Sequence, residues 1–411
     1  MANDREEPQG RLLALPQAPD AIELRHLRAF VAVAEELNFG RAATRLYLSQ
    51  PALSRQISGL ERLIGCDLLR RSTHRVELTL AGEALLDRVR VLLTDLDEAV
   101  SATRSVGGEL SGRAARLWAP VAAWNADDGD LEELSAAYEG LLARFSPPPE
   151  IQIRPVKAGG VPSLLVTDQP ERPATVLYLH GGGYVMGSAY GYRPMAGALS
   201  AATESAVLVP DYRLAPEHPF PAAVDDALRA YLWLLDQGTD SRRIAICGDS
   251  SGAGLAVSLM LHIKRRKLPS PGCLALLCPW VDLAYTLPEE TPDDPQLMVT
   301  DRLMRRCVDQ YLAGHSLHDP VVNPLGFAEE LRGIPPMLIQ AGTGDHLLPQ
   351  AEHLADRARQ NGVEVTLELY PVATHGFHLF WSFLPEAQQA IEQAARFIAA
   401  ATDDWNAVAS G

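Results

Sequence analysis

A serine flanked by glycines, at the end of a short apolar run, restricts the fold of this chain more than any other feature. The run is Ile244–Cys247, and Ser250–Leu261 continues with small and apolar residues at helical spacing. Between them lies Gly248-Asp-Ser-Ser-Gly252, a Gly-x-Ser-x-Gly pattern. A sharp strand-to-helix turn leaves no room for side chains beside the serine and needs strained backbone angles. The pattern predicts a buried strand, an exposed serine oxygen, and a helix whose positive end points at that oxygen.

Any glycine-rich turn between a strand and a helix has a similar sequence, so the serine needs chemical partners from elsewhere in the chain. Short apolar runs predict eight strands, at Ile151–Val156, Val161–Thr167, Thr175–Leu179, Ala206–Pro210, Ile244–Cys247, Cys273–Cys278, Met337–Ala341 and Val365–Tyr370. From the third strand onward they alternate with helical stretches, at Pro194–Ala202, Ala222–Leu235, Ser250–Arg265, Asp301–Leu312, Pro349–Gln360 and Glu386–Ala401. This alternation predicts a mostly parallel sheet with helices on both faces and chemistry at the carboxyl ends of its strands.

A run of glycines follows the third predicted strand, in His180-Gly-Gly-Gly183. Successive glycines let backbone N–H groups turn into a cavity, where they can stabilise an oxyanion together with the N–H of Ser251. A phosphate-binding loop is the alternative, but no Lys-Ser/Thr pair follows and no helix begins directly after the glycines.

Asp345 follows the seventh predicted strand and His375 follows the eighth. With Ser250 they have the chain order Ser, Asp, His that α/β hydrolases use. In that arrangement the histidine takes the serine proton and returns it to the leaving group, while the aspartate orients the imidazole and stabilises its cation. Each residue alone could be a helix cap or a surface histidine, and other acids and histidines compete. None of the competitors combines a strand-end position with the right order.

The block Asp211-Tyr-Arg-Leu-Ala-Pro-Glu-His-Pro-Phe-Pro221 resembles the esterases and lipases related to hormone-sensitive lipase, including lactone-hydrolase-like bacterial members. His180–Gly183, Gly248–Gly252, Pro279-Trp-Val-Asp282 and His375-Gly-Phe377 complete a resemblance that spans roughly residues 130 to 400. It implies hydrolysis of carboxylic esters or lactones through an acyl-serine intermediate, without a metal or a cofactor.

By the same resemblance, Gly182 and Gly183 are the oxyanion glycines, and Asp211 and Arg213 brace the turn beneath the site. Small departures are Gly252-Ala-Gly-Leu255 and Asp345-His-Leu-Leu-Pro349. Neither removes a catalytic group.

The expected substrate contacts are aromatic and apolar side chains beside these motifs, with the loop at 287–300. They are Tyr184, Met186, Trp280 and Phe377. Plain core packing is the alternative for each of them. No arginine is placed to bind a substrate carboxylate, which favours a small neutral ester or lactone.

Composition indicates two domains and a reducing compartment. A chain of 411 residues exceeds one ordinary domain, and 47% hydrophobic residues are ample for cores. No apolar run reaches the roughly 18 residues that span a bilayer. The five cysteines are scattered, as expected of free thiols in a cytoplasmic protein without a membrane segment.

Charge separates the first part of the chain from the rest. The net charge is −16, yet residues 21–82 carry nine arginines against six acids, which leaves −19 elsewhere. A weakly basic module on an acidic body indicates two functions.

This module has the pattern of a helix-turn-helix. Leu24–Leu37 has one apolar face at helical spacing, and Arg41–Leu46 is a second, short helix. Ser49 is the expected N-cap of a third helix that reaches about Ile64. The residues expected at DNA are Ser49, Gln50, Pro51, Ser54 and Arg55 on that helix, and Arg71 and Arg75 on a small hairpin wing. A generic three-helix bundle with a solvated arginine face is the alternative.

Residues 22–107 resemble the winged-helix domain of LysR-type transcriptional regulators, above all in Ser49-Gln-Pro-Ala-Leu-Ser-Arg-Gln-Ile57. The resemblance implies binding of double-stranded DNA. Residues 79–106 continue as a predicted helix of roughly 42 Å with Leu85, Val89 and Leu92 near a heptad register. In that family this helix pairs two chains, so we expect a homodimer; packing on the chain's own second domain is the alternative.

The expected organisation is a disordered tail at 1–20, a winged helix-turn-helix at 21–82, a linker helix and hinge at 83–112, and an α/β hydrolase at 113–411. An active ester hydrolase with a DNA-binding head is the favoured function. A transcription regulator whose hydrolase domain only senses a ligand is the alternative. A recent gene fusion with a vestigial head is the third.

Overall fold

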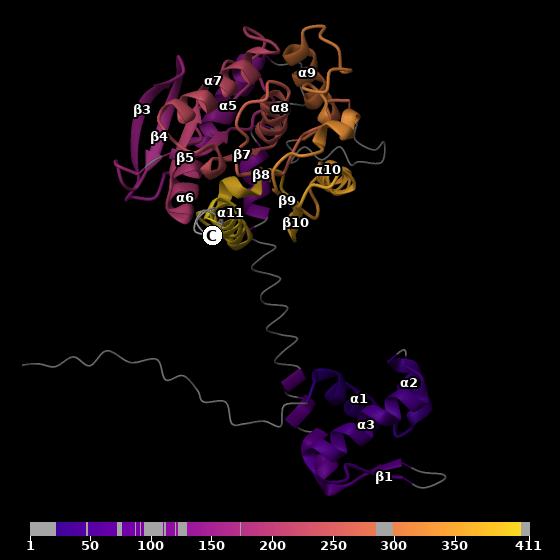
Figure 1. The fold of residues 1–411 in the computed structure, drawn as a ribbon. Helices are drawn as coiled ribbons and strands as arrows, with labels where there is room; N and C mark the ends of the chain where they lie inside the picture. The colour runs from indigo at the N-terminus through magenta and orange to yellow at the C-terminus, as the bar shows by residue number, and fades with distance from the viewer. Residues whose placement is uncertain are drawn as a thin grey trace, which may run out of the picture. The chain divides into compact units, whose positions relative to one another are not determined.

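The computed structural model describes residues 22–46, 48–71, 76–86, 88–90, 92–93, 110, 112–119, 121, 130–172, 174–284 and 299–403. The predicted tail at 1–20 lies outside these residues. The chain divides into two compact units, Met1–Gly107 and Gly108–Gly411, which are taken in turn (Figure 1).

The first unit is a three-helix domain with a two-stranded wing. Its elements are α1 (Leu24–Glu36), α2 (Phe39–Arg45), α3 (Gln50–Ile64), β1 (Leu69–Arg71) and β2 (Val76–Leu78). The apolar faces of the helices bury Phe30, Leu53 and Ile57 in one core. The side chain of Asn38 caps α2 and that of Ser49 caps α3, so each helix begins where its cap satisfies a free backbone N–H.

The segment after β2 is helical at the described positions 80–86, 88–90 and 92–93, and the rest of the predicted linker helix to 106 lies outside the description. Leu85 and Leu86 pack on the core of the first unit, and Val89 is buried. Leu92 stays 49% exposed. Part of the apolar stripe expected to pair two chains is therefore covered within one chain.

The second unit is built on a sheet of eight strands in the order β10-β9-β8-β7-β5-β6-β4-β3. The strands are β3 (Gln152–Ala158), β4 (Val161–Thr167), β5 (Ala174–Leu179), β6 (Ala206–Pro210), β7 (Ala245–Asp249), β8 (Cys273–Leu277), β9 (Met337–Gly342) and β10 (Val365–Tyr370). All neighbours are parallel except the pairs β3–β4 and β4–β6. The predicted mostly parallel sheet is confirmed.

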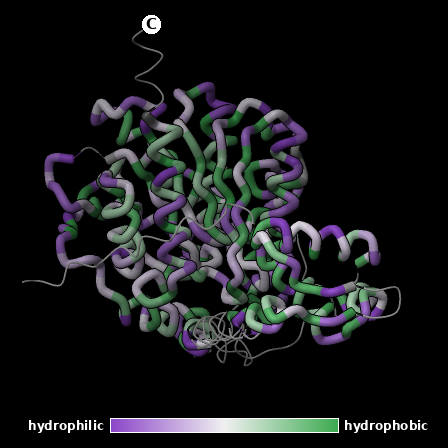
Figure 2. Tube along the Cα trace, turned by 90° about the horizontal axis from the view of Figure 1, so that it is seen from below, coloured by the Kyte–Doolittle hydropathy of each residue, from purple (hydrophilic) through white to green (hydrophobic). Residues whose placement is uncertain are grey.

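Helices cover both faces of this sheet. They are α5 (Leu131–Leu142), α6 (Arg193–Thr203), α7 (Ala222–Asp236), α8 (Ser251–Arg265), α9 (Asp301–Leu312), α10 (Leu348–Gln360) and α11 (Pro385–Asp403). The pair α7 and α8 packs above the sheet and the pair α6 and α11 below it in Figure 1. Inner strands such as β6, β8 and β9 are buried along their length and mostly hydrophobic (Figure 2), because both faces of a covered sheet are buried. Among the described helices, none has the length and apolar character needed to cross a membrane.

Strand register brings the predicted motifs to one edge of the sheet. Leu179, at the end of β5, pairs with Gly248 of β7, so the glycine run and the serine turn start side by side. Asp249 pairs with Leu277 of β8, and Gly342 of β9 pairs with Tyr370 of β10. Because β6 lies on the far side of β5 from β7, the chain changes direction across the sheet here, which is where such folds bind ligands.

One element was not predicted. Residues 112–119 are helical, and Trp118 is buried in the core of the second unit. The second unit, Gly108–Gly411, includes this helix.

Candidate functional site

Ser250 lies on a tight turn between β7 and α8, with φ 52° and ψ −121°. Such angles are strained for any residue with a side chain and need support from the surroundings. The Ser250 N–H donates to the carbonyl of Leu277 at 2.9 Å. A side chain at Gly252 would meet the carbonyl oxygen of Leu179 at 2.1 Å, and one at Gly248 would meet the carbonyl oxygen of Gly252 at 2.5 Å. Only glycine fits on either side of this turn.

The structure brings the three predicted catalytic side chains together. His375 Nε2 lies 2.9 Å from Ser250 Oγ. On the other side of the ring, His375 Nδ1 lies 2.8 Å from Asp345 Oδ2 and 3.1 Å from Asp345 Oδ1. All three residues are less than a tenth exposed. This is the hydrogen-bonded order of a nucleophile, a base and an orienting acid.

The pKa shifts of His375 and Asp345 agree with this arrangement. Burial by itself would lower the pKa of His375, but the charge and hydrogen bond of Asp345 outweigh it, and the pKa is raised. Burial opposes ionisation of Asp345, yet His375 and the N–H of Leu347, 2.9 Å from Asp345 Oδ1, lower the pKa of this carboxyl. An imidazolium formed next to Ser250 is therefore stabilised.

Asp249, directly before the serine, is a site residue that the sequence analysis missed. Its Oδ1 accepts from the Tyr178 hydroxyl at 2.8 Å and from the Gly181 N–H at 2.9 Å. Its Oδ2 accepts from the Tyr192 hydroxyl at 2.8 Å. Burial raises the pKa of Asp249, and these donors oppose the rise. The carboxylate thus ties the glycine run after β5 to the serine turn after β7.

Gly182 and Gly183 have φ values of 120° and 63°, which only glycine adopts readily. A side chain at Gly182 would meet the Met186 carbonyl oxygen at 2.1 Å, and one at Gly183 would meet Cys307 Sγ at 2.7 Å. Ser251 is the first residue of α8, where a backbone N–H has no partner one turn earlier. These are the positions expected to donate to an oxyanion.

A small cavity of about 30 Å³ opens beside Ser250. Apart from Ser250, the lining residues are apolar or carry a thiol: Gly183, Met186, Trp280, Val299, Leu303, Met304, Cys307 and Leu347. Met186 and Trp280 were expected here. The three α9 residues were missed, because no sequence signal links a helix more than fifty positions away to the serine.

The other two expected pocket residues do not line this cavity. Tyr184 is buried and stacks on Tyr311 with ring centroids 3.9 Å apart. Phe377 is fully buried against Tyr370 and His378. Both have the core-packing role that the sequence analysis kept as the alternative.

Structural supports surround the site. The Asp211 carboxylate accepts from the Ala189 N–H at 2.8 Å, and Arg213 makes two 2.8 Å contacts with the buried Asp226. This agrees with the bracing role expected of both. Trp118, from the unpredicted helix, donates its indole N–H to the His375 carbonyl at 3.0 Å.

The head presents the expected polar residues at the start of α3. Gln50, Pro51 and Arg55 are exposed, while Ser54 is half-buried and Ser49 caps the helix. The side chains of Arg71 and Arg75, expected on the wing, lie outside the described residues.

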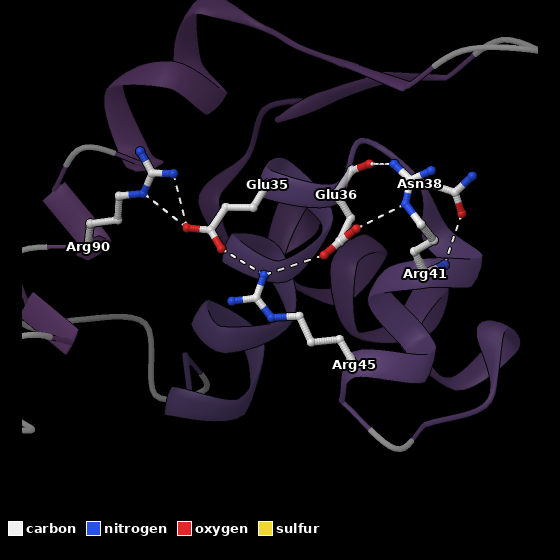
Figure 3. Close-up of polar contacts among 6 residues, drawn as sticks. All are labelled: Glu35, Glu36, Asn38, Arg41, Arg45 and Arg90. Carbon is white, nitrogen blue, oxygen red and sulfur yellow. Dashed lines mark hydrogen bonds and ion pairs between the residues drawn. The ribbon is translucent and has the colours of Figure 1, made fainter.

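Two other arginines of the head are held by ion pairs, together with one from the linker (Figure 3). Glu35 accepts from Arg45 at 2.8 Å and from Arg90 at 3.0 Å. Glu36 accepts from Arg41 at 3.0 Å. The hydrogen bonds from Arg45 and Arg90 lower the pKa of Glu35 against a partial burial that opposes them. Glu35 thus joins α1 and α2 to the first turns of the linker segment.

Comparisons with known proteins agree with both units. A family profile of the alpha/beta hydrolase fold matches residues 176–379, and one of the lysR family of bacterial regulatory helix-turn-helix proteins matches residues 24–83. An acetyl-hydrolase of Streptomyces hygroscopicus is 36% identical over 68% of this chain and 94% of its own. An esterase of Acinetobacter venetianus is 33% identical over 64% and 87%.

A solved esterase of the bacterial hormone-sensitive lipase family matches with a TM-score of 0.65 and 34% identity, over 71% of this chain and 97% of its own. The match therefore covers nearly the whole of that esterase. This chain therefore belongs to the hormone-sensitive-lipase family of α/β-hydrolase esterases, which are carboxylic ester hydrolases, and carries a LysR-family helix-turn-helix domain at its N-terminal end.

Proposed function

We propose that this chain hydrolyses esters through an acyl-serine intermediate on Ser250. The observation that carries the proposal is the 2.9 Å contact between Ser250 Oγ and His375 Nε2, with Asp345 on the other ring nitrogen. His375 removes the hydroxyl proton as the oxygen attacks the ester carbonyl. Asp345 holds the tautomer whose Nε2 can accept that proton.

The negative charge that develops on the carbonyl oxygen is stabilised by backbone N–H groups of Gly182, Gly183 and Ser251. Loss of one such donor typically lowers the rate about 100- to 1000-fold. When the tetrahedral intermediate collapses, His375 passes its proton to the leaving alcohol. A water then repeats the sequence on the acyl-enzyme, with His375 again as the base.

The cavity supports a short, uncharged acyl group. Its volume of about 30 Å³ is above the roughly 10–15 Å³ that holds one water molecule, so the space beside Ser250 can take a small acyl group. None of its lining side chains carries a charge. The acetyl-hydrolase relative agrees with acetyl esters as the first substrates to test. Lactones are the second class of substrate to test, because attack by Ser250 on a lactone also gives an acyl-serine intermediate.

Purified protein assayed with p-nitrophenyl acetate, p-nitrophenyl butyrate and γ-butyrolactone tests this directly, beside Ser250→Ala. Turnover of acetate above butyrate that disappears in Ser250→Ala is the expected result. Equal turnover in both proteins would exclude Ser250 as the nucleophile. Absence of turnover in folded protein would favour the alternative, a regulator whose hydrolase domain senses a ligand.

We propose that the head binds double-stranded DNA through Ser49, Gln50, Pro51, Ser54 and Arg55, with Arg71 and Arg75 of the wing at phosphates. Support comes from the match to the lysR family and from the exposure of the first turn of α3. A DNA-binding role implies the cytoplasm, and the half-exposed Leu92 fits pairing of two linker helices in a homodimer.

Selection of bound fragments from a genomic DNA library, followed by binding titrations, tests the head. Arg55→Ala should lose the selected sequences, whereas Arg62→Ala, an exposed arginine in the last turn of the same helix, should retain them. Ester hydrolysis should be equal in both variants, because residues 21–82 and 113–411 are proposed as separable domains. Sedimentation velocity gives the oligomeric state of the same samples.

A further inference from the structure

A buried thiol lies behind the catalytic residues. Cys278 follows β8 directly, is 1% exposed, and has φ 45°. Its N–H donates to the carbonyl of Gln340 at 2.7 Å, which anchors the strained residue. Its sulfur lies within 4.8 Å of both an Asp345 carboxylate oxygen and a His375 ring nitrogen. The thiol is also among the groups that lower the pKa of the Asp345 carboxyl against its burial.

A second buried group, His378, faces the same sulfur. Its Nδ1 lies 3.9 Å from Cys278 Sγ and its Nε2 lies 3.1 Å from Gln340 Oε1. The Gln340 amide nitrogen donates to Glu368 at 2.8 Å and to the Ala390 carbonyl at 2.9 Å. The amide oxygen must therefore face His378, and a carbonyl oxygen only accepts.

The orientation of the Gln340 amide determines which atoms of His378 and Cys278 carry a hydrogen. His378 Nε2 carries the hydrogen that Gln340 accepts, and burial lowers the pKa of His378 to about 3, so the ring is neutral and Nδ1 is bare. Burial also raises the pKa of the Cys278 thiol, which keeps its hydrogen. The sulfur is then the donor of one hydrogen, and the two acceptors that face it are His378 Nδ1, 3.9 Å away, and the Asp345 carboxylate, within 4.8 Å. A charged acceptor forms the stronger hydrogen bond.

We propose that Cys278 is a positioning residue for ester hydrolysis, whose thiol donates to the Asp345 carboxylate while His378 holds the sulfur in place. The inference rests on the proposed roles of Ser250, His375 and Asp345. The N–H of Leu347 and the thiol together orient the carboxylate toward His375 Nδ1. The thiol also withdraws part of the negative charge that raises the basicity of His375.

Cys278→Ala tests the proposal, with Cys273→Ala as the matched control. Cys273 is another fully buried free thiol on β8, but it is not among the groups around Asp345. Cys278→Ala should lower kcat about tenfold with KM within twofold, which corresponds to one hydrogen bond to a charged group. Cys278→Ser should restore kcat because its hydroxyl can donate. Cys273→Ala should be unchanged in both constants.

The pH profile separates this role from a merely structural one. The groups that act on the His375 pKa are Asp345, Asp249 and neutral His378, and the substitution alters the charge of none of them. Without the thiol, Asp345 attracts the imidazolium proton more strongly, so the acidic limb of kcat/KM should move to higher pH. Cys278→Ser should return it to or below the wild-type position.

Equal kcat and an unmoved limb in folded Cys278→Ala would overturn the proposal, and so would a loss that serine fails to restore. If the alanine variant does not fold, a tenfold loss of kcat in Cys278→Ser, or a limb that moves to higher pH in that variant, would overturn it instead. Ester hydrolysis that is equally fast in the wild type and in Ser250→Ala would count against the proposed function itself. The two failures are thereby distinguished.

Discussion

The Asp249 carboxylate offers the sharpest perturbation of the site outside the three catalytic residues. It accepts from Tyr178, Tyr192 and Gly181, and all of these groups are buried. Asp249→Ala would leave three donors without a partner. Each buried unsatisfied donor costs about 1–3 kcal/mol, so we expect a loss of about 3–9 kcal/mol from the free energy of unfolding. Small to medium proteins have about 5–15 kcal/mol in total.

Asp249→Asn is the matched variant with nearly the same shape. Its amide oxygen can accept from Tyr178 and Gly181, and its NH₂ then faces the Tyr192 hydroxyl. Tyr192 can turn to donate to the Tyr138 hydroxyl, 2.6 Å away, so that among the native donors only the Tyr138 hydroxyl loses its acceptor. We expect asparagine to keep most of the stability, and alanine to displace the loop that carries the oxyanion donors and lower kcat at least 100-fold.

Urea unfolding and p-nitrophenyl acetate kinetics on the two variants measure both effects. Asp249→Ala within 1 kcal/mol of wild type and with kcat within twofold would refute the reasoning. Equal damage from asparagine and alanine would show that the negative charge, rather than the hydrogen bonds, is what the site needs.

Three further predictions concern the base, the cavity and the head. Because the pKa of His375 is raised and the base must be neutral, kcat/KM should rise with pH through a midpoint above about 6.5; a midpoint below that value would contradict the assignment. Met304→Ala should raise the butyrate-to-acetate ratio of kcat/KM about tenfold, since two further methylenes gain about 0.8 kcal/mol each on burial; an unchanged ratio would exclude this cavity as the acyl site. Glu35→Gln should speed amide hydrogen exchange in α1 and around Arg90, with the difference shrinking in high salt; equal exchange would mean that these half-exposed ion pairs contribute nothing measurable.

Local sequence was sufficient for the elements and for the residues at strand ends. Runs such as Ala206–Pro210 are buried along their whole length, which gives a clear apolar signal of strand length. Ser250, Asp345 and His375 could be chosen because their order and strand-end positions are properties of the chain itself. The glycines beside them are detectable because no other residue fits.

Partners brought together by the fold could not be predicted. Asp249 collects donors from β5, the loop after it and the segment before α6, and no spacing in the sequence relates these three. Met304 and Cys307 reach the cavity because α9 packs over it. The helix at 112–119 was missed because it starts where the expected hinge at 83–112 ends. Phe377 was expected in the pocket, but an aromatic residue beside a catalytic histidine can equally fill the core, as it does here.

Covalent labelling tests the central claim most directly. Diethyl p-nitrophenyl phosphate transfers a diethylphosphoryl group to an activated serine, and peptide mass spectrometry locates the adduct. Ser250 should carry one adduct per chain, in proportion to the loss of esterase activity, and Ser250→Ala should carry none. An adduct on another residue, or full labelling of Ser250 with activity retained, would contradict the account.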